Sequence, residues 1–256
     1  MSESDGSALF RFHEGIKELL RPGNREAELF CPVLRRASVK DVIESLGVPH
    51  TEVGRITAKG LERDFTYLPA AGDTLDVYAV TPPLDVTLPC VLRPMPLQKI
   101  SFVVDVNVGK LARLLRLLGL DAAYDHLWRD TKIADLAATQ GRIALSRDRS
   151  LLKRKKIEFG RLIRAEDPQD QLLEVLSFFG IKGPFRTFSR CLYCNLELEP
   201  VDKAEILHRL EPLTKKYFNV FHICPGCGRI YWPGSHHEKM LKWLLRAGLE
   251  AEGVRG

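Results

Sequence analysis

Four of the six cysteines form two CxxC pairs, and this spacing constrains the fold more than any other feature of the chain. The pairs are Cys191/Cys194 and Cys224/Cys227, with 29 residues between them. Four thiolates on two such turns can close a tetrahedral site around zinc at about 2.3 Å, and the glycines of CPGCG give the second turn its backbone freedom. Such a site leaves no open position for water, so we expect a structural zinc that organises a small ribbon. Two local disulfides or an iron–sulfur centre are the alternatives.

The expected cellular location favours metal binding by the cysteine pairs over disulfide formation. No stretch approaches the roughly 18–20 consecutive apolar residues of a membrane helix, and the first 15 residues have neither a basic region nor an apolar run. We therefore expect no secretory signal, no membrane association and a cytoplasmic location, where cysteine pairs bind metal. Cys31 and Cys90 are isolated and are expected to be unreactive packing residues.

The net charge of +5 is unevenly distributed. Residues 1–98 carry 11 Lys/Arg against 14 Asp/Glu, for −3, and residues 99–256 carry 27 against 19, for +8. This asymmetry predicts two units, the second with an anionic partner, although a solvated basic surface is the alternative.

Residues 8–81 predict a small mixed sheet packed on one helix. A strand begins near residue 8 and ends in a turn or short helix, two short strands flank a turn within 54–69, and a last strand covers 72–80. Between them, 38–48 is an amphipathic helix with Ser38 as its N-cap and Gly47 as its stop. Five prolines then fall within 82–96, so a linker or extended edge is expected near 83–97.

From residue 99 the pattern alternates between strand and helix. Strands are expected at 99–106, 120–125, 142–146 and 159–166, and helices at 107–119, 130–141 and 168–180. This order predicts a three-layer α/β domain around a mainly parallel sheet over about 99–180. The cysteine pairs follow, and 236–249 is a terminal amphipathic helix.

Acidic residues follow all four of these strands, where the carboxyl ends of a parallel sheet bind ligands. They are Asp105, Asp125, Asp130, Asp148, Glu166 and Asp167. If they converge, such carboxylates suit Mg²⁺ or Mn²⁺, which can activate water and stabilise both oxygens of a phosphoryl displacement. Asp105 and Asp148 are favoured because each follows a buried-type strand directly, with Asp130 or Asp125 as a further ligand. A helix cap or surface turn is the alternative for each.

Cations surround this acidic set. Nine residues within 142–164 are basic and two are acidic, and the helix that begins beside Asp105 also carries basic residues on its polar side. Such crowding fits a polyanionic substrate. The residues expected to position phosphates are Lys110, Arg113, Arg116, Arg147 and Arg149. The run KRKK at 153–156 either extends this surface or is a solvated loop.

Several of these segments resemble one known family. FVVDVNVGKLARLLRLLGLDA, GRIALSRDRSLL, RCLYCNLELEPV and CPGCGRIYWPGSHHEKM, in this order over about 99–243, are similar to the ribonuclease domain named for the carboxy-terminal region of the Mut-seven exonuclease. The resemblance implies a PIN-like fold with an appended zinc ribbon, RNA cleavage at a divalent-metal acidic site, and a match of Asp105 and Asp148 to that site. The middle acidic residue is Asp125, Asp130 or Asp135.

The amino-terminal series resembles the ubiquitin-like β-grasp domain that often precedes this ribonuclease domain. The domain is related to small sulfur carriers, which act through a free terminal Gly-Gly. Here the last strand runs into Thr81-Pro82-Pro83, so no thiocarboxylate can form and we expect a binding or scaffolding module, with a protein partner of its own.

These inferences combine into one expected architecture. A ubiquitin-like domain covers 8–82, a proline-rich linker 83–97, a PIN-like ribonuclease domain 98–185, and a zinc ribbon with the terminal helix 186–250. The expected function is divalent-metal-dependent hydrolysis of RNA phosphodiester bonds. The rival is a non-catalytic RNA-binding adaptor that uses the ribbon and the basic loop.

Overall fold

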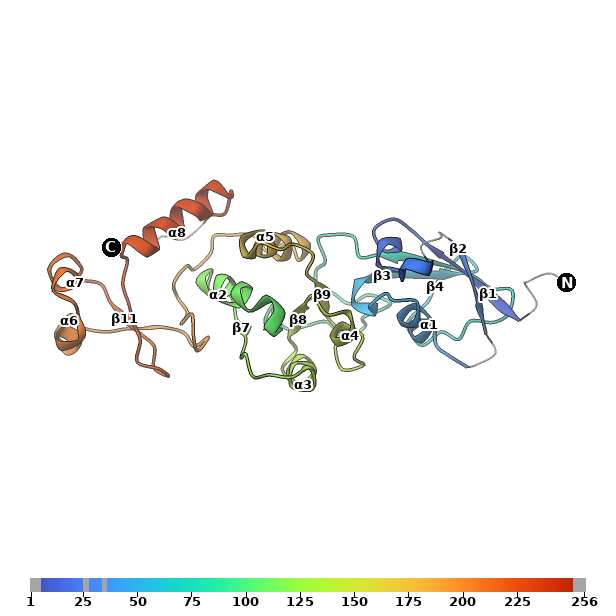
Figure 1. Cartoon of the computed structure of the whole chain (residues 1–256), viewed down its shortest axis with the longest axis horizontal. Coiled ribbons are helices and arrows are strands. Elements are labelled where there is room, and N and C mark those ends of the chain that lie inside the picture. The colour runs from blue at the N-terminus through green and yellow to red at the C-terminus, as the bar shows by residue number, and fades with distance from the viewer. Residues whose placement is uncertain (1–5, 25–27, 34–35, 251–256) are drawn as a thin grey trace.

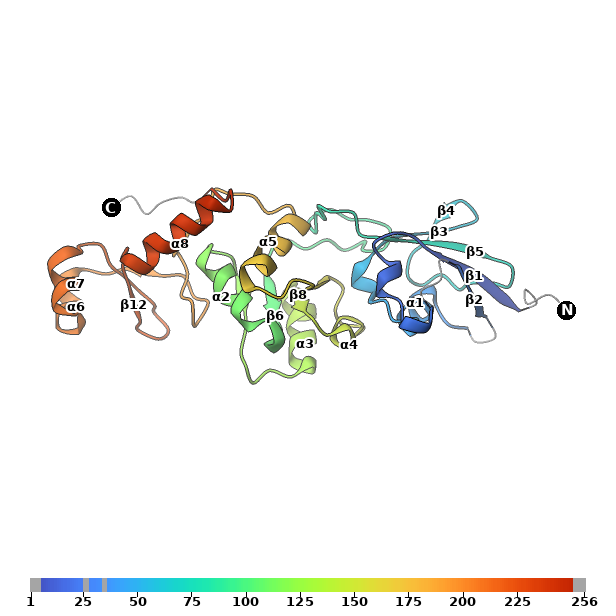
Figure 2. The ribbon, with the colours of Figure 1, turned by 45° about the horizontal axis from the view of Figure 1, so that its top comes forward.

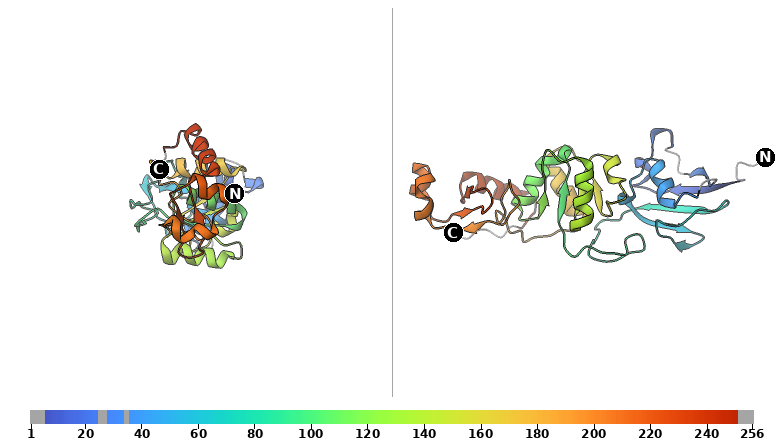
Figure 3. Two further views of the ribbon diagram at one scale, coloured as in Figure 1. Left: turned by 90° about the vertical axis from the view of Figure 1, so that its left-hand side faces the viewer. Right: turned by 90° about the horizontal axis from the view of Figure 1, so that it is seen from below.

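The computed structural model describes residues 6–24, 28–33 and 36–250; the first five residues, which entered the expectation about a secretory signal, lie outside these ranges. A β-rich unit, an α/β unit and a small cysteine-containing unit lie in a row along the molecule (Figure 1). The views in Figure 2 and in the right panel of Figure 3 show the same order. No helix within the described ranges is long and apolar enough to cross a membrane.

The amino-terminal unit is a five-stranded sheet in the order β2-β1-β5-β3-β4. Its strands are β1 (Ser7–Phe12), β2 (Glu28–Pro32), β3 (Val53–Ala58), β4 (Leu61–Glu62) and β5 (Thr74–Ala79). The central pair β1–β5 is parallel and the other pairs are antiparallel. This is the expected β-grasp arrangement. The edge strand β2 was not predicted, because most of its residues are exposed and it lacks a clean two-residue alternation.

One helix, α1 (Val39–Ser45), packs on this sheet through Val39 and Ile43. Ser38 Oγ accepts a hydrogen bond from the Asp41 amide, and the Asp41 carboxylate accepts one from the Ser38 amide, so both ends of a capping box are present. Gly47 follows at φ +114°, a conformation that favours glycine. The predicted helix start and stop are therefore confirmed.

The middle unit is a four-stranded, fully parallel sheet in the order β7-β6-β8-β9. Its strands are β6 (Phe102–Val104), β7 (Ala122–Ala123), β8 (Ile143–Ser146) and β9 (Gly160–Leu162). Its helices are α2 (Gly109–Leu117), α3 (Asp130–Gln140), α4 (Arg149–Leu152) and α5 (Pro168–Phe178). Short 3-10 helices occur at Lys17–Leu19, Pro22–Asn24, His50–Glu52, Val106–Val108 and Leu207–Arg209.

The side chains of the central strands alternate between two cores, as a three-layer domain requires. Phe102 and Val104 of β6 pack with residues of α2 and α5. Val103, between them, packs with residues of α3 and α4 on the opposite face. The predicted three-layer architecture is confirmed. Helix α4 was not predicted, because it is a single turn directly before the KRKK run.

The proline-rich segment is packed rather than free. Val86 is 1% exposed and Leu92 is 6% exposed, and the Leu84 amide donates to the Phe178 carbonyl of α5. Arg93 is 2% exposed and donates to four carbonyls, those of His50, Thr51 and Val53 in the amino-terminal unit and that of Glu158 in the middle unit. The segment expected to be a linker at 83–97 therefore joins the two units.

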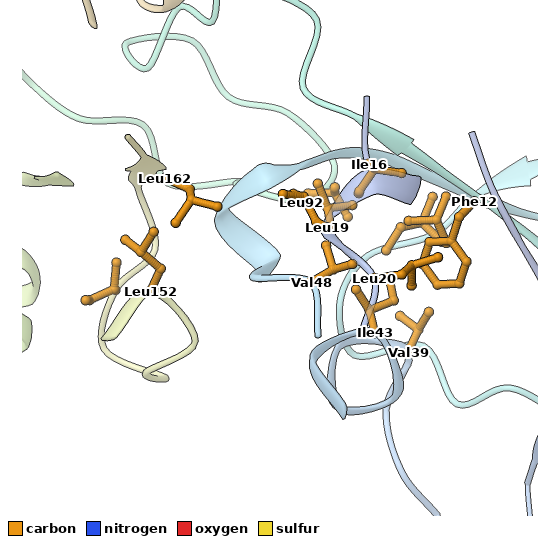
Figure 4. Close-up of a cluster of buried hydrophobic side chains, with 14 of the residues drawn as sticks. Phe12, Ile16, Leu19, Leu20, Val39, Ile43, Val48, Leu92, Leu152 and Leu162 are labelled. Carbon is orange, nitrogen blue, oxygen red and sulfur yellow. The ribbon is translucent and has the colours of Figure 1, made fainter. Parts of the chain in front are cut away.

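The two units also share a hydrophobic core. One cluster contains Ile16, Leu19 and Leu20 of the first unit together with Leu152 and Leu162 of the second, and Leu92 belongs to the same cluster (Figure 4). A buried ion pair supports this contact: Arg161 Nη1 lies 2.6 Å from Glu52 Oε2. The β-grasp unit is thus part of one continuous packed body with the middle unit.

The carboxy-terminal unit has a three-stranded antiparallel sheet, and helices lie before and after its last two strands. Its elements are β10 (Glu199–Pro200), α6 (Lys203–Ile206), α7 (Pro212–Tyr217), β11 (His222–Ile223) and β12 (Ile230–Tyr231). Ile206, Leu210 and Phe221 give it a small core of its own. The last helix, α8 (Ser235–Arg246), packs Leu244 into the core of α2 and α5, and its His237 ring lies 4.1 Å from that of Phe188.

Candidate functional site

Asp105 directly follows β6 and is 5% exposed. Its carboxylate accepts hydrogen bonds from the Val106 amide (2.7 Å), Asn107 Nδ2 (2.7 Å) and Ser146 Oγ (2.6 Å). Three donors therefore hold a nearly buried carboxylate in one orientation at the carboxyl edge of the sheet.

Ser146, the last residue of β8, links Asp105 to Asp148. Its hydroxyl donates to Asp105 and accepts from the Asp148 amide at 2.8 Å. The half-buried Asp148 carboxylate in turn accepts from the Ser150 amide and caps α4. Asn107 completes the connection by accepting from the Arg147 amide. The structure thus joins the two acidic residues that the sequence favoured, through Ser146 and Asn107, which sequence reasoning missed. Both residues could have been found as candidates from the sequence, because each is a polar residue at or just after the end of an apolar strand.

A cavity of about 550 Å³ lies beside this linked pair and is called the sheet-edge cavity below. Its charged and polar walls are Asn107, Lys110, Arg113, Tyr124, Arg147, Glu166 and Gln171. Gly109 also forms part of the wall. Any side chain at this position would collide with the Tyr124 hydroxyl. Three cations against one carboxylate make the cavity suited to an anion.

Of the other expected acidic residues, Glu166 lines the sheet-edge cavity, whereas Asp125, Asp130 and Asp135 have local partners elsewhere. Asp125 accepts a hydrogen bond from the Leu127 amide in its own turn, and Asp130 lies 3.3 Å from Arg154. Asp135 is paired with Lys156 at 2.7 Å. Within the described residues, no three carboxylates come close enough to share a metal ion. The expected convergence of acidic residues from all four strands is therefore wrong, because the turns after β7 and the start of α3 direct Asp125 and Asp130 to local partners.

Arg116 is the clearest departure among the expected phosphate contacts. It is 3% exposed and donates to the carbonyls of Ala122 (2.8 Å), Leu192 (2.9 Å) and Tyr193 (2.8 Å). Lys110, Arg113 and Arg147 are exposed and line the sheet-edge cavity, whereas Arg149, also exposed, donates to the Leu19 carbonyl of the β-grasp unit. Arg116 faces inward because it lies on the buried face of α2, and its function is structural.

Much of the basic run is likewise engaged within the protein. Lys153 donates to the Glu44 carbonyl, and Arg154 and Lys156 pair with the acidic residues of α3 described above. Lys155 is exposed. The run is therefore neither a loose loop nor a uniformly free cationic strip.

The four cysteines of the CxxC pairs form one cluster whose sulfur atoms all lie within 4.8 Å of one another. All four are free thiols rather than two local disulfides, and Cys191 Sγ and Cys227 Sγ, which belong to different pairs, are 3.7 Å apart. Four sulfurs at about 2.3 Å from a tetrahedral zinc would lie about 3.8 Å apart, so the cluster fits that ion. The Arg229 amide hydrogen bond lowers the pKa of Cys227 to about 6, whereas the hydrogen bond with Cys227 raises the pKa of Cys194 to about 12 and burial raises that of Cys224.

The two CxxC turns have the same backbone design. The fourth residue after each first cysteine has a positive φ: Asn195 at 65° and Gly228 at 66°. In both turns the amide of this residue donates to the carbonyl of the first cysteine. Glycine adopts this conformation freely and asparagine is tolerated there, so both turns are knuckles that aim their thiols at one point.

The first knuckle is attached to the middle unit. Arg116 of α2 donates to two of its carbonyls, as described, and Asn195 Oδ1 accepts from the Ala122 amide of β7. Asn195 Nδ2 donates to Asp121 at 2.7 Å. Half-burial raises the pKa of Asp121, but the hydrogen bonds from Arg142 and Asn195 outweigh it and hold that pKa below its ordinary value. The ribbon is thus docked onto the edge of the parallel sheet.

The class of protein is therefore a mixed α/β one, with a β-grasp sheet, a parallel three-layer domain and a docked four-cysteine ribbon. The family model of the Mut7-C RNAse domain matches residues 100–244, more than half of the chain, and that of the Mut7-C ubiquitin domain matches residues 6–85. The chain therefore belongs to the Mut7-C RNAse domain family. Neither a curated protein nor a solved structure matches it.

Proposed function

We propose that this protein is a ribonuclease that binds the RNA phosphate backbone in the sheet-edge cavity and cleaves it beside Asp105 and Asp148. The observation that carries this proposal is that Ser146 joins the Asp105 carboxylate to the Asp148 main chain, while the chain neighbours Val106, Asn107 and Arg147 line a cavity together with Lys110 and Arg113. The family assignment supports RNA as the substrate. Free thiols ready for zinc fit a reducing compartment, so we place the reaction in the cytoplasm.

The cations and the carboxylates have different tasks in this proposal. The exposed Lys110, Arg113 and Arg147 neutralise and orient the phosphates. Ser146 and Asn107 keep the Asp105 carboxylate fixed through their hydrogen bonds, so little reorganisation is needed when charge develops nearby. Gln171, 4% exposed, donates to the Ala165 and Glu166 carbonyls and stabilises the opposite wall.

A divalent cation is part of the proposal, with Asp105 and Asp148 as its protein ligands. The sequence predicted a larger acidic cluster, with more than two carboxylates. Two carboxylates still fit Mg²⁺, which commonly binds through one or two carboxylates and takes further ligands from water and substrate phosphates. When bound, such an ion supplies charge neutralisation and an activated water at the phosphate.

Replacing Asp105 with Asn tests the proposal. Asp105→Asn preserves the shape of the side chain but removes the charge that a divalent cation requires, so we expect metal-dependent cleavage of labelled RNA to fall at least 100-fold. All three groups that contact the Asp105 carboxylate donate hydrogen bonds to it. The side-chain NH2 group of the new asparagine cannot accept one, so at least one of these hydrogen bonds is lost and the free energy of unfolding should fall by about 1–3 kcal/mol. RNA affinity should change little, because the cations remain.

Asp135→Asn is the matched control, since it makes the same change in an exposed ion pair on α3. Cleavage by this control should equal that of the unmodified protein in Mg²⁺ or Mn²⁺ and stop in EDTA. If Asp105→Asn still cleaves RNA at the normal rate, the assigned site is wrong.

The second candidate function is a non-catalytic RNA-binding adaptor. The observation that favours it is that no three carboxylates of the described residues come close enough to share a metal ion, and that Asp105 and Asp148 already accept hydrogen bonds from protein donors. An adaptor would bind RNA with a strong salt dependence and cleave none in any divalent cation.

A further inference from the structure

The zinc ribbon carries a second cavity, of about 450 Å³, which nothing above has used. It is called the ribbon groove here, and its polar and aromatic walls are Tyr193, Arg209, Glu211, Arg229, Tyr231 and Trp232. It combines three aromatic rings with two arginines and one carboxylate on a unit that has only a small core.

Two of these aromatic side chains are open to solvent. Tyr193 is 51% exposed and Trp232 is 38% exposed. The guanidinium of Arg229 lies 3.8 Å from the centroid of the Tyr193 ring, so the cation and the ring form one stacked pair. Tyr231 differs, because its hydroxyl hydrogen bonds with Cys191 Sγ and accepts from the Leu192 amide at the metal site.

The groove is held by the metal knuckles. Arg209 donates to the Gly228 carbonyl of the second knuckle at 2.6 Å, and Tyr193 belongs to the first knuckle. Trp232 lies against Phe221 of the ribbon core, with ring centroids 6.4 Å apart. The stacking surface is therefore preformed, which lowers the entropic cost of binding a flexible ligand.

Tyr193 also links the groove to the sheet-edge cavity. Arg113, which lines that cavity, places its guanidinium 5.2 Å from the centroid of the same Tyr193 ring. Cations and rings thus follow one another from Arg147 and Arg113 in the cavity to Arg229 and Trp232 in the groove.

We propose that the ribbon groove binds single-stranded RNA that flanks the nucleotide held in the sheet-edge cavity, with bases stacked on Trp232 and on the Arg229–Tyr193 pair. This inference rests on the proposed function and names the form of its substrate. Unpaired bases expose their faces to aromatic rings and arginine planes, whereas the bases of a duplex already stack on each other. Arginines beside open rings are the combination that binds single strands with little sequence preference.

The test uses the full-length zinc-loaded protein with a fluorescent 12-nucleotide oligouridylate, a duplex of the same length and a dinucleotide substrate. Binding is measured in EDTA at a concentration that leaves the zinc in place, checked by metal analysis. We expect Trp232→Ala to weaken binding of the single strand about tenfold, the effect of losing one stacked base, and to leave duplex binding unchanged. Cleavage of the dinucleotide, which reaches only the sheet-edge cavity, should be normal.

Two further variants separate stacking from folding. Trp232→Phe retains a ring and should restore most of the affinity, provided that zinc content is unchanged in all variants. Tyr217→Ala removes an aromatic side chain that is 64% exposed on α7 and is not part of the groove, so it should bind the single strand normally.

The outcomes distinguish this inference from the proposed function. If Trp232→Ala, loaded with zinc, binds the oligouridylate as well as the unmodified protein does, the groove inference is overturned while metal-dependent cleavage can still stand. If binding depends on Trp232 but no RNA is cleaved in any divalent cation, the groove stands and the ribonuclease proposal fails. Equal weakening of duplex and single-strand binding would show a general charge or folding effect and would also overturn the inference.

Discussion

At the scale of single residues, two arginines one turn apart on α2 show how helix geometry separates function from stability. Arg113 is exposed and lines the sheet-edge cavity, whereas Arg116 is buried and donates to main-chain carbonyls. Residues three apart lie near each other on a helix, but they are rotated slightly about its axis. Here that rotation leaves Arg113 exposed to solvent and Arg116 buried in the domain.

Replacing Arg116 with Met should therefore reduce stability rather than RNA binding. The change leaves the Leu192 and Tyr193 carbonyls without their charged donor, so we expect the free energy of unfolding in urea to fall by about 3 kcal/mol. Arg113→Met, the matched control, should unfold at the normal urea concentration and bind RNA more weakly. If Arg116→Met instead weakened RNA binding and left the stability unchanged, Arg116 would be a phosphate contact, as the sequence predicted.

The candidate site could be predicted only in part. Asp105 and Asp148 were recognisable because each follows an apolar strand, and the cysteines because of their spacing. Ser146 and Asn107 were not, since their roles depend on hydrogen bonds across about 40 residues of sequence. Arg116 was misassigned because a charged residue is rarely buried, and only the carbonyls of a distant knuckle make its burial favourable.

At the scale of elements, the basic run after β8 has fewer free charges than its sequence implies. Lys153 is bonded to the β-grasp unit, and two of its neighbours pair with α3. The exposed cations of the sheet-edge cavity are therefore expected to dominate RNA binding.

This difference can be measured through the salt dependence of RNA affinity. Each phosphate contact on a single strand contributes about −0.7 to the slope of log K against log salt. Replacing Lys110, Arg113 and Arg147 together with Ala should flatten the slope by about 2. Replacing residues 153–156 with Ala should flatten it by less than about 1. A larger effect from the second set would make the basic run the main RNA contact.

The zinc ribbon should depend on its metal as an element. Metal analysis should return about one zinc per chain, because a four-thiolate site binds one ion. Cys224→Ser should lose the zinc and make residues 187–236 sensitive to protease, while the β-grasp sheet stays protected. Cys90→Ser, which alters an exposed cysteine elsewhere, should retain both zinc and resistance. A ribbon that stays protected without zinc would contradict this assignment.

The helices were the most predictable elements and the short strands the least. Capping at Ser38 and glycine stops at Gly47 and Gly141 fixed their ends. The ribbon strands have two residues each, too few for any periodicity to be visible. Helix α8 was predicted, but its packing partner was not, because an amphipathic pattern reveals a buried face without saying what covers it.

At the scale of the whole molecule, Arg93 makes the β-grasp and middle units interdependent. Its four carbonyl partners lie on both units, and the hydrophobic core is continuous across the contact. The sequence could not predict this contact, since a proline-rich segment reads as a linker whether or not it is packed. The β-grasp unit packs against the middle unit in this arrangement, and both its role as a binding or scaffolding module and a separate protein partner stay predictions.

Calorimetry of an Arg93 variant tests this dependence. Arg93→Met should lower the free energy of unfolding by about 3 kcal/mol, because four carbonyls, three of them in buried hydrogen bonds, lose their donor, and both units should still unfold in one transition. Arg55→Met, which changes an exposed arginine on β3, should have little effect. Two separate transitions in the unmodified protein would show that the units fold independently.

Asn195 has a consequence for how strongly the whole molecule can hold one RNA strand. A glycine at this position would keep the left-handed turn but lose both side-chain bonds to the sheet edge, loosening the docked ribbon. In the complex proposed above, a strand bound in the sheet-edge cavity would meet the docked ribbon groove at a high effective concentration, so two weak contacts would act as one bivalent contact. If the ribbon moved freely relative to the sheet, the same two contacts would be nearly independent. The proposal therefore makes avidity for RNA depend on the Asn195 side chain, which is neither a cysteine of the metal cluster nor a residue of the groove.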